Sequence, residues 1–473
     1  MPALEGIEHV IVLMLENRSF DCMLGKLYPS DPSFEGLRGG ENNVWLNQPV
    51  PVWSSTNTPL DSTSACIPDP DPGESFTDMT MQLFGQPPAP TATMAGFVQN
   101  YMAQTPMPAS SRAPMHYFTP EQVPVISTLA KSFGVCDQWY ASAPCQTWPN
   151  RFFTHTGTSQ GFVNNDQFPI PFPAPSIFGL LSAAGRSWRV YFHDVLQSIL
   201  LRDVWLRAPL HYRFFSTFLS DAINGTLPNY SFIEPHYFTD LFLNRIPNDQ
   251  HPPHNVLYGE QLIAAVYNAV RNSPVWKKSL LVITYDEHGG CFDHMPPPAA
   301  VSPGGPLPQG FAFDRYGVRV PAVIVSPYMP PGSRVRAMPT GVPSPAAPHP
   351  FDHTSIIKTL RLLFNLGGPL TNRDAAAPDL LGPLSLIDPQ NDGPATVTPV
   401  PATPTIAQLE TRAAASPNGM QSALSQMAAQ LPPQPLPPGA ALPPPSAMVA
   451  PAQATVARAH LNAVSQVRAF LGL

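Results

Sequence analysis

Three polar clusters in the sequence contain the residue types that catalyse reactions. The first is ENRSFD, in which Glu16 and Asn17 directly follow an apolar run. The second is WPNRFFTHTGTSQG (148–161), which has four hydroxyl side chains beside two glycines. The third is TYDEHGGCFDHMPPP (284–298), which also begins where an apolar run ends. Its ionisable side chains are Asp286, Glu287, His288, Asp293 and His294.

These residue types suit a divalent cation and an activated hydroxyl. Carboxylates from two strand ends, together with an amide oxygen, form a good site for a hard cation. A hydroxyl next to such a cation loses its proton readily, because the metal stabilises the alkoxide. The arrangement favours attack on phosphorus over attack on an acyl carbon. The sequence contains neither a GxSxG elbow nor a GxxxxGK[ST] loop, which disfavours an α/β-hydrolase esterase and a nucleotide triphosphatase.

Each cluster alone also has a purely structural explanation. ENRSFD is compatible with a strand end and a capped turn, and DEHGG with a solvated turn. The hydroxyls between Thr154 and Ser159 are compatible with a helix cap. The presence of all three clusters in one chain, two of them directly after apolar strands, favours a functional site.

The elements that must position these clusters are strands alternating with helices. Four near-continuous apolar runs predict strands covered on both faces, as in a parallel sheet. They lie at 9–16, 187–194, 279–290 and 318–328. Helical periodicity appears at 255–273 and at 353–366. The alternation predicts an α/β layered domain with its ligand site beyond the carboxyl ends of the strands.

Two segments differ in composition from this core. Residues 26–115 are rich in Pro, Ser, Asp and Gly, and they predict a loop-rich insertion over the active-site edge of the sheet. A proline-rich run at 432–445 predicts an extended spacer, followed by a terminal helix. The predicted organisation is a catalytic domain at 1–390 and an extension at 391–473.

Composition excludes several other classes of protein. Of the 473 residues only 12% are charged and 63 are proline, and the net charge of −7 with no basic run argues against a nucleic-acid partner. The five cysteines are scattered without CxxC spacing, so a structural zinc site is not expected. No apolar stretch reaches ~18 residues, so no transmembrane helix is predicted. The N-terminus has no recognisable secretory signal, which predicts a cytoplasmic protein or one exported by another route.

Several motifs resemble one phosphoesterase family, in the order that the family has them. They include LMLENRSFDCMLG, PNRFFTHTGTSQG, ITYDEHGGCFDHMPPP and FDHTSIIKTL. This family contains plant non-specific phospholipases C, bacterial phospholipases C and a respiratory-burst-inhibiting acid phosphatase. The resemblance extends from about residue 7 to about residue 366. It implies an alkaline-phosphatase-like α/β/α sandwich with a mostly parallel central sheet.

The resemblance also implies a metal-activated hydroxyl nucleophile. The implied metal ligands are Glu16, Asn17, Thr158, Asp286 and Glu287, with Thr158 as the nucleophile as well. Zn, Mg, Mn and Ca all remain open as the ion. Gly157 and Gly161 flank Thr158 and predict a tight turn into a helix N-terminus, where a phosphate binds well. Thr156 and Ser159 are the alternatives in the same turn.

The histidines are implied to handle the phosphate oxygens or the leaving group. His251 and His294 are the candidate general acids, and Asn17, His254 and His353 are candidates for phosphate binding. Many relatives have DPDPGHS where this chain has DPDPGES, so Glu74 replaces a histidine at the mouth of the site. A carboxylate there either adds a metal ligand or repels an anionic phosphate.

The function predicted first is a metal-dependent phospholipase C with a phosphothreonine intermediate. It would hydrolyse glycerophospholipids such as phosphatidylcholine to diacylglycerol and a phosphorylated head group, with peripheral contact to a membrane surface. The second interpretation is an acid phosphatase acting on small phosphate esters. The third, motivated by Glu74, is a catalytically impaired protein that binds a lipid or phosphate.

Overall fold

The computed structural model describes residues 5–165, 168–337, 349–437, 439–447 and 455–473. Its centre is an eight-stranded sheet with the strand order β11-β4-β10-β9-β1-β8-β6-β7. The strands are β1 (His9–Leu15), β4 (Gly134–Val135), β6 (Trp188–Phe192), β7 (Tyr212–Phe214), β8 (Tyr230–Ile233), β9 (Ser279–Tyr285), β10 (Ala322–Val325) and β11 (Ser333–Arg334).

β1 lies in the middle of this sheet, between two parallel neighbours. Val10 to Leu13 pair with β8, and the whole strand pairs with β9. Every residue of β1 after His9 is buried, because helices cover both faces of the sheet. The near-continuous apolar run is therefore explained, and the predicted α/β architecture with a mostly parallel central sheet is confirmed.

One side of the sheet departs from the parallel pattern. β10 pairs antiparallel with both β9 and β4, although its apolar run was grouped with the parallel strands. A fully buried strand has the same apolar composition in either direction, so periodicity alone does not reveal its orientation. β8 was not predicted at all, since its segment Tyr230–Ile233 is only four residues long.

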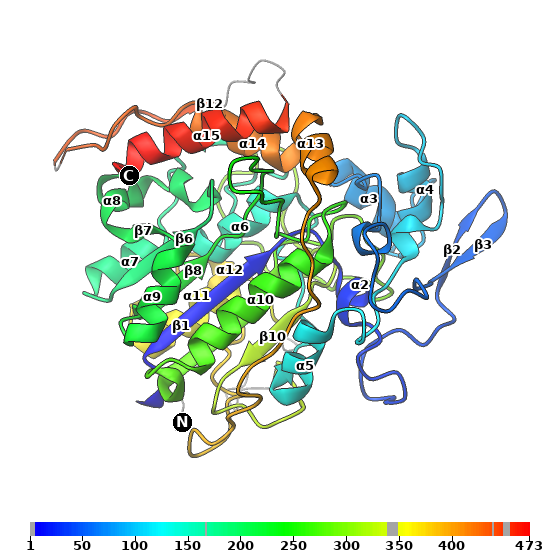
Figure 1. Ribbon diagram of the computed structural model, residues 1–473, viewed down its shortest axis with the longest axis horizontal. Coiled ribbons are helices and arrows are strands. Elements are labelled where there is room, and N and C mark those ends of the chain that lie inside the picture. The colour runs from blue at the N-terminus through cyan, green and yellow to red at the C-terminus, as the bar shows by residue number, and fades with distance from the viewer. Residues whose placement is uncertain (1–4, 166–167, 338–348, 438, 448–454) are drawn as a thin grey trace.

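Helices form a layer on each side of the sheet (Figure 1). α10 packs on β1 and β9, α5 on β10, and α9 on β6 and β7, while α6 contacts α7 and α11 in the other layer. The predicted helices at 255–273 and 353–366 correspond to α10 and α11. The bounds are α5 (Pro124–Ser132), α6 (Thr147–Thr156), α7 (Ile177–Ala183), α9 (Phe215–Asn224), α10 (Val256–Arg271) and α11 (Thr354–Phe364).

Residues 26–115 form a lobe with a small core of its own. The hairpin β2–β3 packs beside α4, and α4 packs on α3. Figure 1 shows this lobe in blue and cyan, at the side of the molecule toward which the arrowhead of β1 points. The elements are α2 (Phe20–Leu24), which precedes the lobe, then β2 (Asn42–Trp45), β3 (Gln48–Pro51), α3 (Phe76–Phe84) and α4 (Phe97–Met102).

The C-terminal segment contributes three helices that pack on one another and on the body. α15 contacts α13 and α14, and the ring of Phe470 lies 5.4 Å from that of Trp205. The bounds are α13 (Ile406–Ala414), α14 (Gly419–Ala428) and α15 (Val456–Leu471), and the remaining short elements are β5 (Pro169–Ile170), α8 (Ala208–His211), α12 (Asn372–Ala376) and β12 (Ser446–Ala447). In the part of the chain that the structure describes, no helix is both long and apolar enough to cross a bilayer.

Candidate active site

The ends of β1 and β9 bring the first and third polar clusters together. Leu15 and Tyr285 are register partners in the parallel pair, so the residues that follow them emerge side by side. The backbone N–H of Asn17 donates to Asp286 Oδ1 over 3.0 Å, as does that of Glu287 over 2.7 Å. The four residues predicted from these strand ends, Glu16, Asn17, Asp286 and Glu287, therefore lie in one fully buried cluster.

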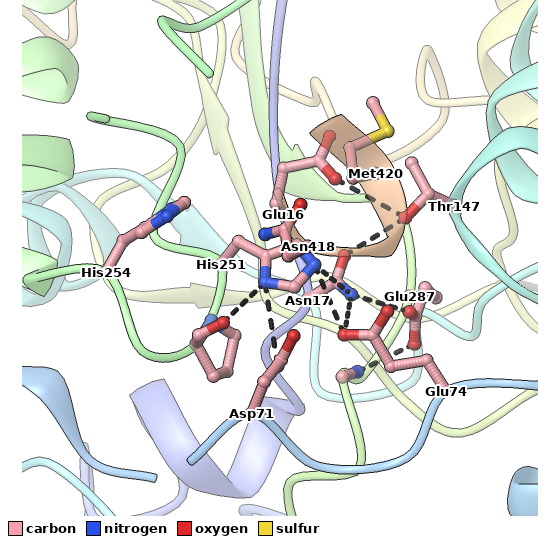
Figure 2. Close-up of polar contacts among 12 residues, drawn as sticks. Glu16, Asn17, Asp71, Glu74, Thr147, His251, His254, Glu287, Asn418 and Met420 are labelled. Atoms are coloured by element: carbon pink, nitrogen blue, oxygen red, sulfur yellow. Dashed lines mark hydrogen bonds and ion pairs between the residues drawn. The ribbon is translucent and has the colours of Figure 1, made fainter. Parts of the chain in front are cut away.

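The side chain of Asn17 is at the centre of this cluster (Figure 2). Its Nδ2 donates to Glu287 Oε1 over 2.8 Å and to Glu74 Oε1 over 2.6 Å, and it lies 3.1 Å from His251 Nε2. The backbone of Asn17 has a φ of +55°, a conformation that asparagine tolerates better than most residues. This left-handed turn directs the amide into the cluster at the point where the strand ends.

A threonine hydroxyl reaches the cluster from the N-terminus of α6. Thr147 is the first residue of that helix, and its Oγ1 lies 3.4 Å from Glu16 Oε2 and 3.3 Å from Asn17 Oδ1. The side chain is fully buried. The N-terminus of a helix carries partial positive charge, which stabilises an alkoxide or a phosphate placed there. Thr147 therefore brings a buried hydroxyl, at a helix N-terminus, against the carboxylate and amide of the cluster.

Thr158, the nucleophile expected from the sequence, lies at the other end of the same helix. α6 ends at Gly157 with a left-handed φ of +73°, so the expected helix start at Thr158 is wrong. The ten residues of α6 span about 15 Å. Thr158 Oγ1 accepts the N–H of Gln160 over 2.9 Å, and within the described chain no hydrogen bond of Thr158 reaches the cluster.

The alternatives Thr156 and Ser159 are turned away as well. Thr156 Oγ1 donates to the carbonyl oxygens of Phe152 and Thr158, and Ser159 Oγ donates to that of Phe162 over 2.7 Å. All three hydroxyls serve the C-terminal turn of α6. The glycine that was interpreted as a turn into a helix instead ends one, as glycine commonly does.

Arg151 is a residue of this site that the sequence analysis did not assign. It lies four residues after Thr147, on the same face of α6, and it is fully buried. Its guanidinium donates to Glu16 Oε1 and, over 2.8 Å, to Glu234 Oε2, and its Nε lies 3.7 Å from Asp286 Oδ2. The i, i+4 spacing of a threonine and an arginine within a helical segment was the available signal.

Negative charge exceeds positive charge in this buried site. The carboxyl groups around Asn17, the guanidinium of Arg151 and the imidazole of His251 outnumber these two cations; they belong to Glu16, Asp71, Glu74, Glu234, Asp286 and Glu287. Burial, and repulsion by Asp286, raise the pKa of Glu16 well above its usual range despite Arg151, and burial with repulsion by Glu74 and Asp286 does the same for Glu287. A divalent cation would remove this excess of negative charge.

The donor atoms also fit such a cation. Asp286 Oδ2 is buried and accepts no hydrogen bond. Buried polar atoms are rarely left without a partner, so an orphaned carboxylate oxygen needs a ligand. A second group of possible ligand atoms, from Asp71, Glu74 and His251, lies next to the first, with all of its atoms within 4.8 Å of one another. Oxygen donors of this kind are those that hard divalent cations prefer.

His251 is the histidine that the structure brings to the cluster. Burial by itself would lower the pKa of the imidazole, but Glu74 and Asp71 outweigh it and raise the pKa well above its usual value. The Nε2 atom lies 3.2 Å from Glu74 Oε1, and Nδ1 is within 2.6 Å of the carbonyl oxygen of Pro252. His251 thus lies at the edge of the site, with Asn17, Asp71 and Glu74 around its ring (Figure 2).

Two of the other predicted histidines stand around the cluster. His254 Nδ1 lies 2.7 Å from Asp249 Oδ1, and His353 Nε2 lies 2.6 Å from the carbonyl oxygen of Asp286. Burial lowers the pKa of both imidazoles. His353 thus fixes the backbone at the end of β9.

The structure does not bring His294 to the cluster. Its Nδ1 lies 2.6 Å from Asp21 Oδ2, in a separate group that also contains Asp293 and Arg319. Within the described residues, no hydrogen bond or ion pair joins His294 to the catalytic cluster. His294 follows the same strand as Asp286, but seven further residues carry it past the site.

The C-terminal extension reaches the rim of the site. Met420 Sδ lies 3.1 Å from Trp148 Nε1, next to Thr147, and Figure 2 shows Asn418 and Met420 beside Glu16 and Asn17. Arg412 donates to the carbonyl oxygen of Pro253 over 3.1 Å. No local motif in the extension indicates this contact, because it arises only from tertiary packing.

Comparison with known proteins identifies the family of this chain. The model of the phosphoesterase family matches residues 7–367. Non-specific phospholipase C3 of Arabidopsis thaliana is 37% identical over 415 residues, which cover 84% of this chain and 76% of that protein. Phospholipase C A of Mycobacterium tuberculosis is 28% identical and covers 82% of this chain and 79% of that protein.

A solved structure titled as a protein in the alkaline phosphatase superfamily, from Vibrio parahaemolyticus, covers 54% of this chain and 64% of its own. It is 13% identical to this chain, with a TM-score of 0.30.

The molecule is thus an α/β protein with a buried acidic site at the carboxyl edge of its sheet. The chain belongs to the phosphoesterase family, and it is a phosphoric ester hydrolase.

Proposed function

We propose that the protein is a metal-dependent phospholipase C. It hydrolyses glycerophospholipids such as phosphatidylcholine to diacylglycerol and a phosphorylated head group. The observation that carries the proposal is the Thr147 hydroxyl, which sits at the N-terminus of α6 within 3.4 Å of the buried oxygens of Glu16 and Asn17. The names of the plant and mycobacterial relatives support phospholipids as the substrate class.

The catalytic domain comprises residues 1–390, and five of its residues would hold the divalent cation. They are Glu16, Asn17, Thr147, Asp286 and Glu287, with Thr147 in the place that the sequence analysis gave to Thr158. When bound, the cation neutralises phosphate oxygens and makes the threonine hydroxyl more acidic. Arg151 keeps Glu16 and Asp286 in position, because it contacts both carboxylates.

The reaction proceeds in two displacements at phosphorus. Thr147 Oγ forms a bond to phosphorus, and its proton passes to a neighbouring carboxylate, for which Glu16 Oε2 is 3.4 Å away. The bond from phosphorus to the diacylglycerol oxygen breaks, and protonated His251 gives its proton to that oxygen. Water then attacks the phosphothreonine and gives one proton to the neutral imidazole of His251. The bond from phosphorus to Thr147 Oγ breaks, the phosphorylated head group leaves, and Oγ takes back the proton held by Glu16.

Glu74 has a defined part in this scheme. Together with Asp71 it raises the pKa of His251, so the imidazole stays protonated until the leaving group needs the proton. The carboxylate thus supports acid catalysis at the position where many relatives have a histidine.

Product analysis tests this proposal directly. Purified enzyme is incubated with mixed phospholipids, and the products are identified by mass spectrometry. Diacylglycerol together with phosphocholine is the expected result. Release of inorganic phosphate from small phosphate esters, with no diacylglycerol from the lipids, would instead identify a phosphomonoesterase. Binding of phospholipid without any product would identify a binding protein.

A further inference from the structure

A hairpin after β8 exposes three consecutive large apolar side chains. Leu241, Phe242 and Leu243 are 44%, 79% and 59% exposed. Single exposed apolar residues are common on protein surfaces and need no explanation. Three in succession at one tip are different, because they form a continuous apolar surface that no described residue covers.

The fold holds this tip in its exposed conformation. Asp240 and Arg245 exchange backbone hydrogen bonds of 2.8 and 2.9 Å across the base of the turn. The carboxylate of Asp240 accepts the backbone N–H groups of Phe242 and Leu243 over 2.8 and 3.0 Å. Below the turn, Asn248 bonds to His236 through both its backbone and its side chain. The apolar side chains are therefore presented by a braced turn.

The surroundings of the tip combine apolar walls with cationic groups. A cavity of about 710 Å³ opens beside the tip. The residues around it include Phe214, Leu219, Leu243, Val464 and two arginines, Arg245 and Arg468. Arg245 is exposed, and within the described part of the chain it forms no ion pair with a carboxylate. Arg468 lies over the ring of Phe214, 5.6 Å from its centroid. An apolar surface beside the exposed guanidinium of Arg245 matches the boundary between the acyl chains and the phosphates of a bilayer.

The hairpin is joined directly to the catalytic site. The chain leaves β8 at Ile233 and returns to Asp249, whose carbonyl oxygen accepts the N–H of Glu16 over 2.8 Å. His251 follows two residues later. Because β8 and β1 run parallel, the hairpin and the catalytic cluster emerge from the same edge of the sheet.

We propose that Leu241, Phe242 and Leu243 insert into a phospholipid surface and anchor the enzyme there, with Arg245 on the lipid phosphates. This inference rests on the proposed function, because a phospholipase C takes its substrate from such a surface. The net charge of −7 gives no general attraction to a membrane with anionic lipids, so local apolar insertion must supply the binding. Anchoring through this hairpin holds the catalytic edge of the sheet near the lipid head groups.

The test compares the full chain with a variant that carries Leu241→Ser, Phe242→Ser and Leu243→Ser together. Cosedimentation with phosphatidylcholine vesicles is expected to fall at least tenfold in this variant. The matched control carries Leu210→Ser and Ile223→Ser, at positions that are 68% and 72% exposed outside the hairpin, and it should cosediment like the wild type. Equal cosedimentation of the tip variant and the wild type would overturn the proposal.

A second variant keeps the tip apolar and reports its environment. The emission of Phe242→Trp, compared with that of the wild type, should gain intensity at shorter wavelengths when vesicles are added. The absence of any such change would contradict insertion. Loss of a dimer in the serine variant, with vesicle binding intact, would show that a second copy of the chain covers the tip, and would overturn the lipid proposal as well.

Activity on a dispersed substrate distinguishes an effect on membrane binding from an effect on catalysis. Short-chain phosphatidylcholine below its micelle concentration should be hydrolysed equally by the wild type and the serine variant, while hydrolysis of vesicles falls with cosedimentation. If the wild type hydrolyses no phospholipid in either form, the proposed function fails, and the cosedimentation result still decides whether the tip binds lipid.

Discussion

Two buried ionic clusters follow the same pair of strands, and they differ in how well their charges are satisfied. The catalytic cluster begins directly after β1 and β9, with Glu16 and Asp286. The second cluster lies a few residues further along both segments and contains Asp21 and Asp293, with Arg319 and His294 between them. The residue types are similar. The motifs ENRSFD and TYDEHGGCFDHMPPP each contain residues of both clusters.

The second cluster is saturated by hydrogen bonds. Arg319 donates to Asp21 Oδ1 and Asp293 Oδ1 over 3.0 Å each, and its remaining N–H groups reach the carbonyl oxygens of Glu35 and Asp137. The two carboxylates also accept the backbone N–H groups of His294 and Met295. These side chains bind each other, so the cluster stabilises the fold and has no need of a ligand, although three of its atoms lie close enough for a metal.

The catalytic cluster is left unsatisfied. It has an excess of carboxyl groups, a buried oxygen of Asp286 that accepts no hydrogen bond, and raised pKa values at Glu16 and Glu287. The comparison teaches that residue types alone do not identify a functional site. We therefore assign the proposed function to the cluster whose charges the protein itself does not balance.

The largest expected effect is at the nucleophile. Thr147→Ala should lower kcat by about a thousandfold or more, because no other hydroxyl reaches Glu16 and Asn17 within the described residues. Thr158→Ala should change kcat by less than about twofold, since its hydroxyl only caps a turn. Initial rates of diacylglycerol release and circular dichroism of both variants check this.

Rapid-quench mass spectrometry of the wild type should detect the covalent step as a phosphate adduct on Thr147. Unchanged turnover in Thr147→Ala would mean that water attacks phosphorus directly and that the covalent step does not occur.

The next effect is at the metal. Asp286→Ala should remove the bound ion and lower kcat by about a hundredfold or more, because it removes the orphaned carboxylate oxygen. Chelation of the wild type should abolish activity, and added divalent ions should restore it. Metal content by plasma mass spectrometry is the measurement.

Asp293→Asn is the matched control for this prediction, since it changes a buried carboxylate of the saturated cluster that also follows β9. It should keep the metal of the wild type. Loss of metal from Asp293→Asn and not from Asp286→Ala would reverse the assignment of the two clusters.

The sequence predicted some residues of this site and not others, and the difference has physical reasons. Glu16, Asn17, Asp286 and Glu287 were predictable, because an apolar run that stops at polar residues marks the carboxyl end of a buried strand. The nucleophile depended on the boundaries of one helix. Pro149 in the first turn and Gly157 after the last residue are typical of a helix from Thr147 to Thr156. The sequence analysis instead interpreted Gly157 as part of a turn that leads into a helix.

Long-range contacts account for what could not be predicted. The antiparallel direction of β10, the burial of Arg151 between three carboxylates, and the approach of Met420 to Trp148 depend on which segments pack together. No local pattern encodes them. The separation of His294 from Asp286 also depends on tertiary packing, since the two residues are close in the sequence but belong to different clusters.

A smaller effect concerns the stability that the saturated cluster provides. Arg319→Met should lower the free energy of unfolding by about 3–5 kcal/mol, because it leaves two buried carboxylates without their cation. Turnover per folded molecule should change little. Lys278→Met is the control: its ion pair with Glu8 is exposed, and its loss should cost less than about 1 kcal/mol. Urea unfolding measures both, and equal costs in the two variants would contradict a structural role for the Arg319 cluster.

The smallest expected effect is the pH dependence of stability that His294 provides. Burial opposes the charge on this imidazole, but Asp21 and Asp293 outweigh burial and raise its pKa above 6.5. A raised pKa in the folded state means that the pair stabilises the fold fully below about pH 6.5 and loses this contribution as the pH rises through the folded pKa. The wild type should therefore exceed His294→Gln in unfolding free energy by up to about 1 kcal/mol at pH 6, and by less at pH 9. Urea titrations at both pH values measure the difference. An advantage that instead grows with pH would indicate a neutral imidazole, the form that binds metal, and would place a cation in the second cluster as well.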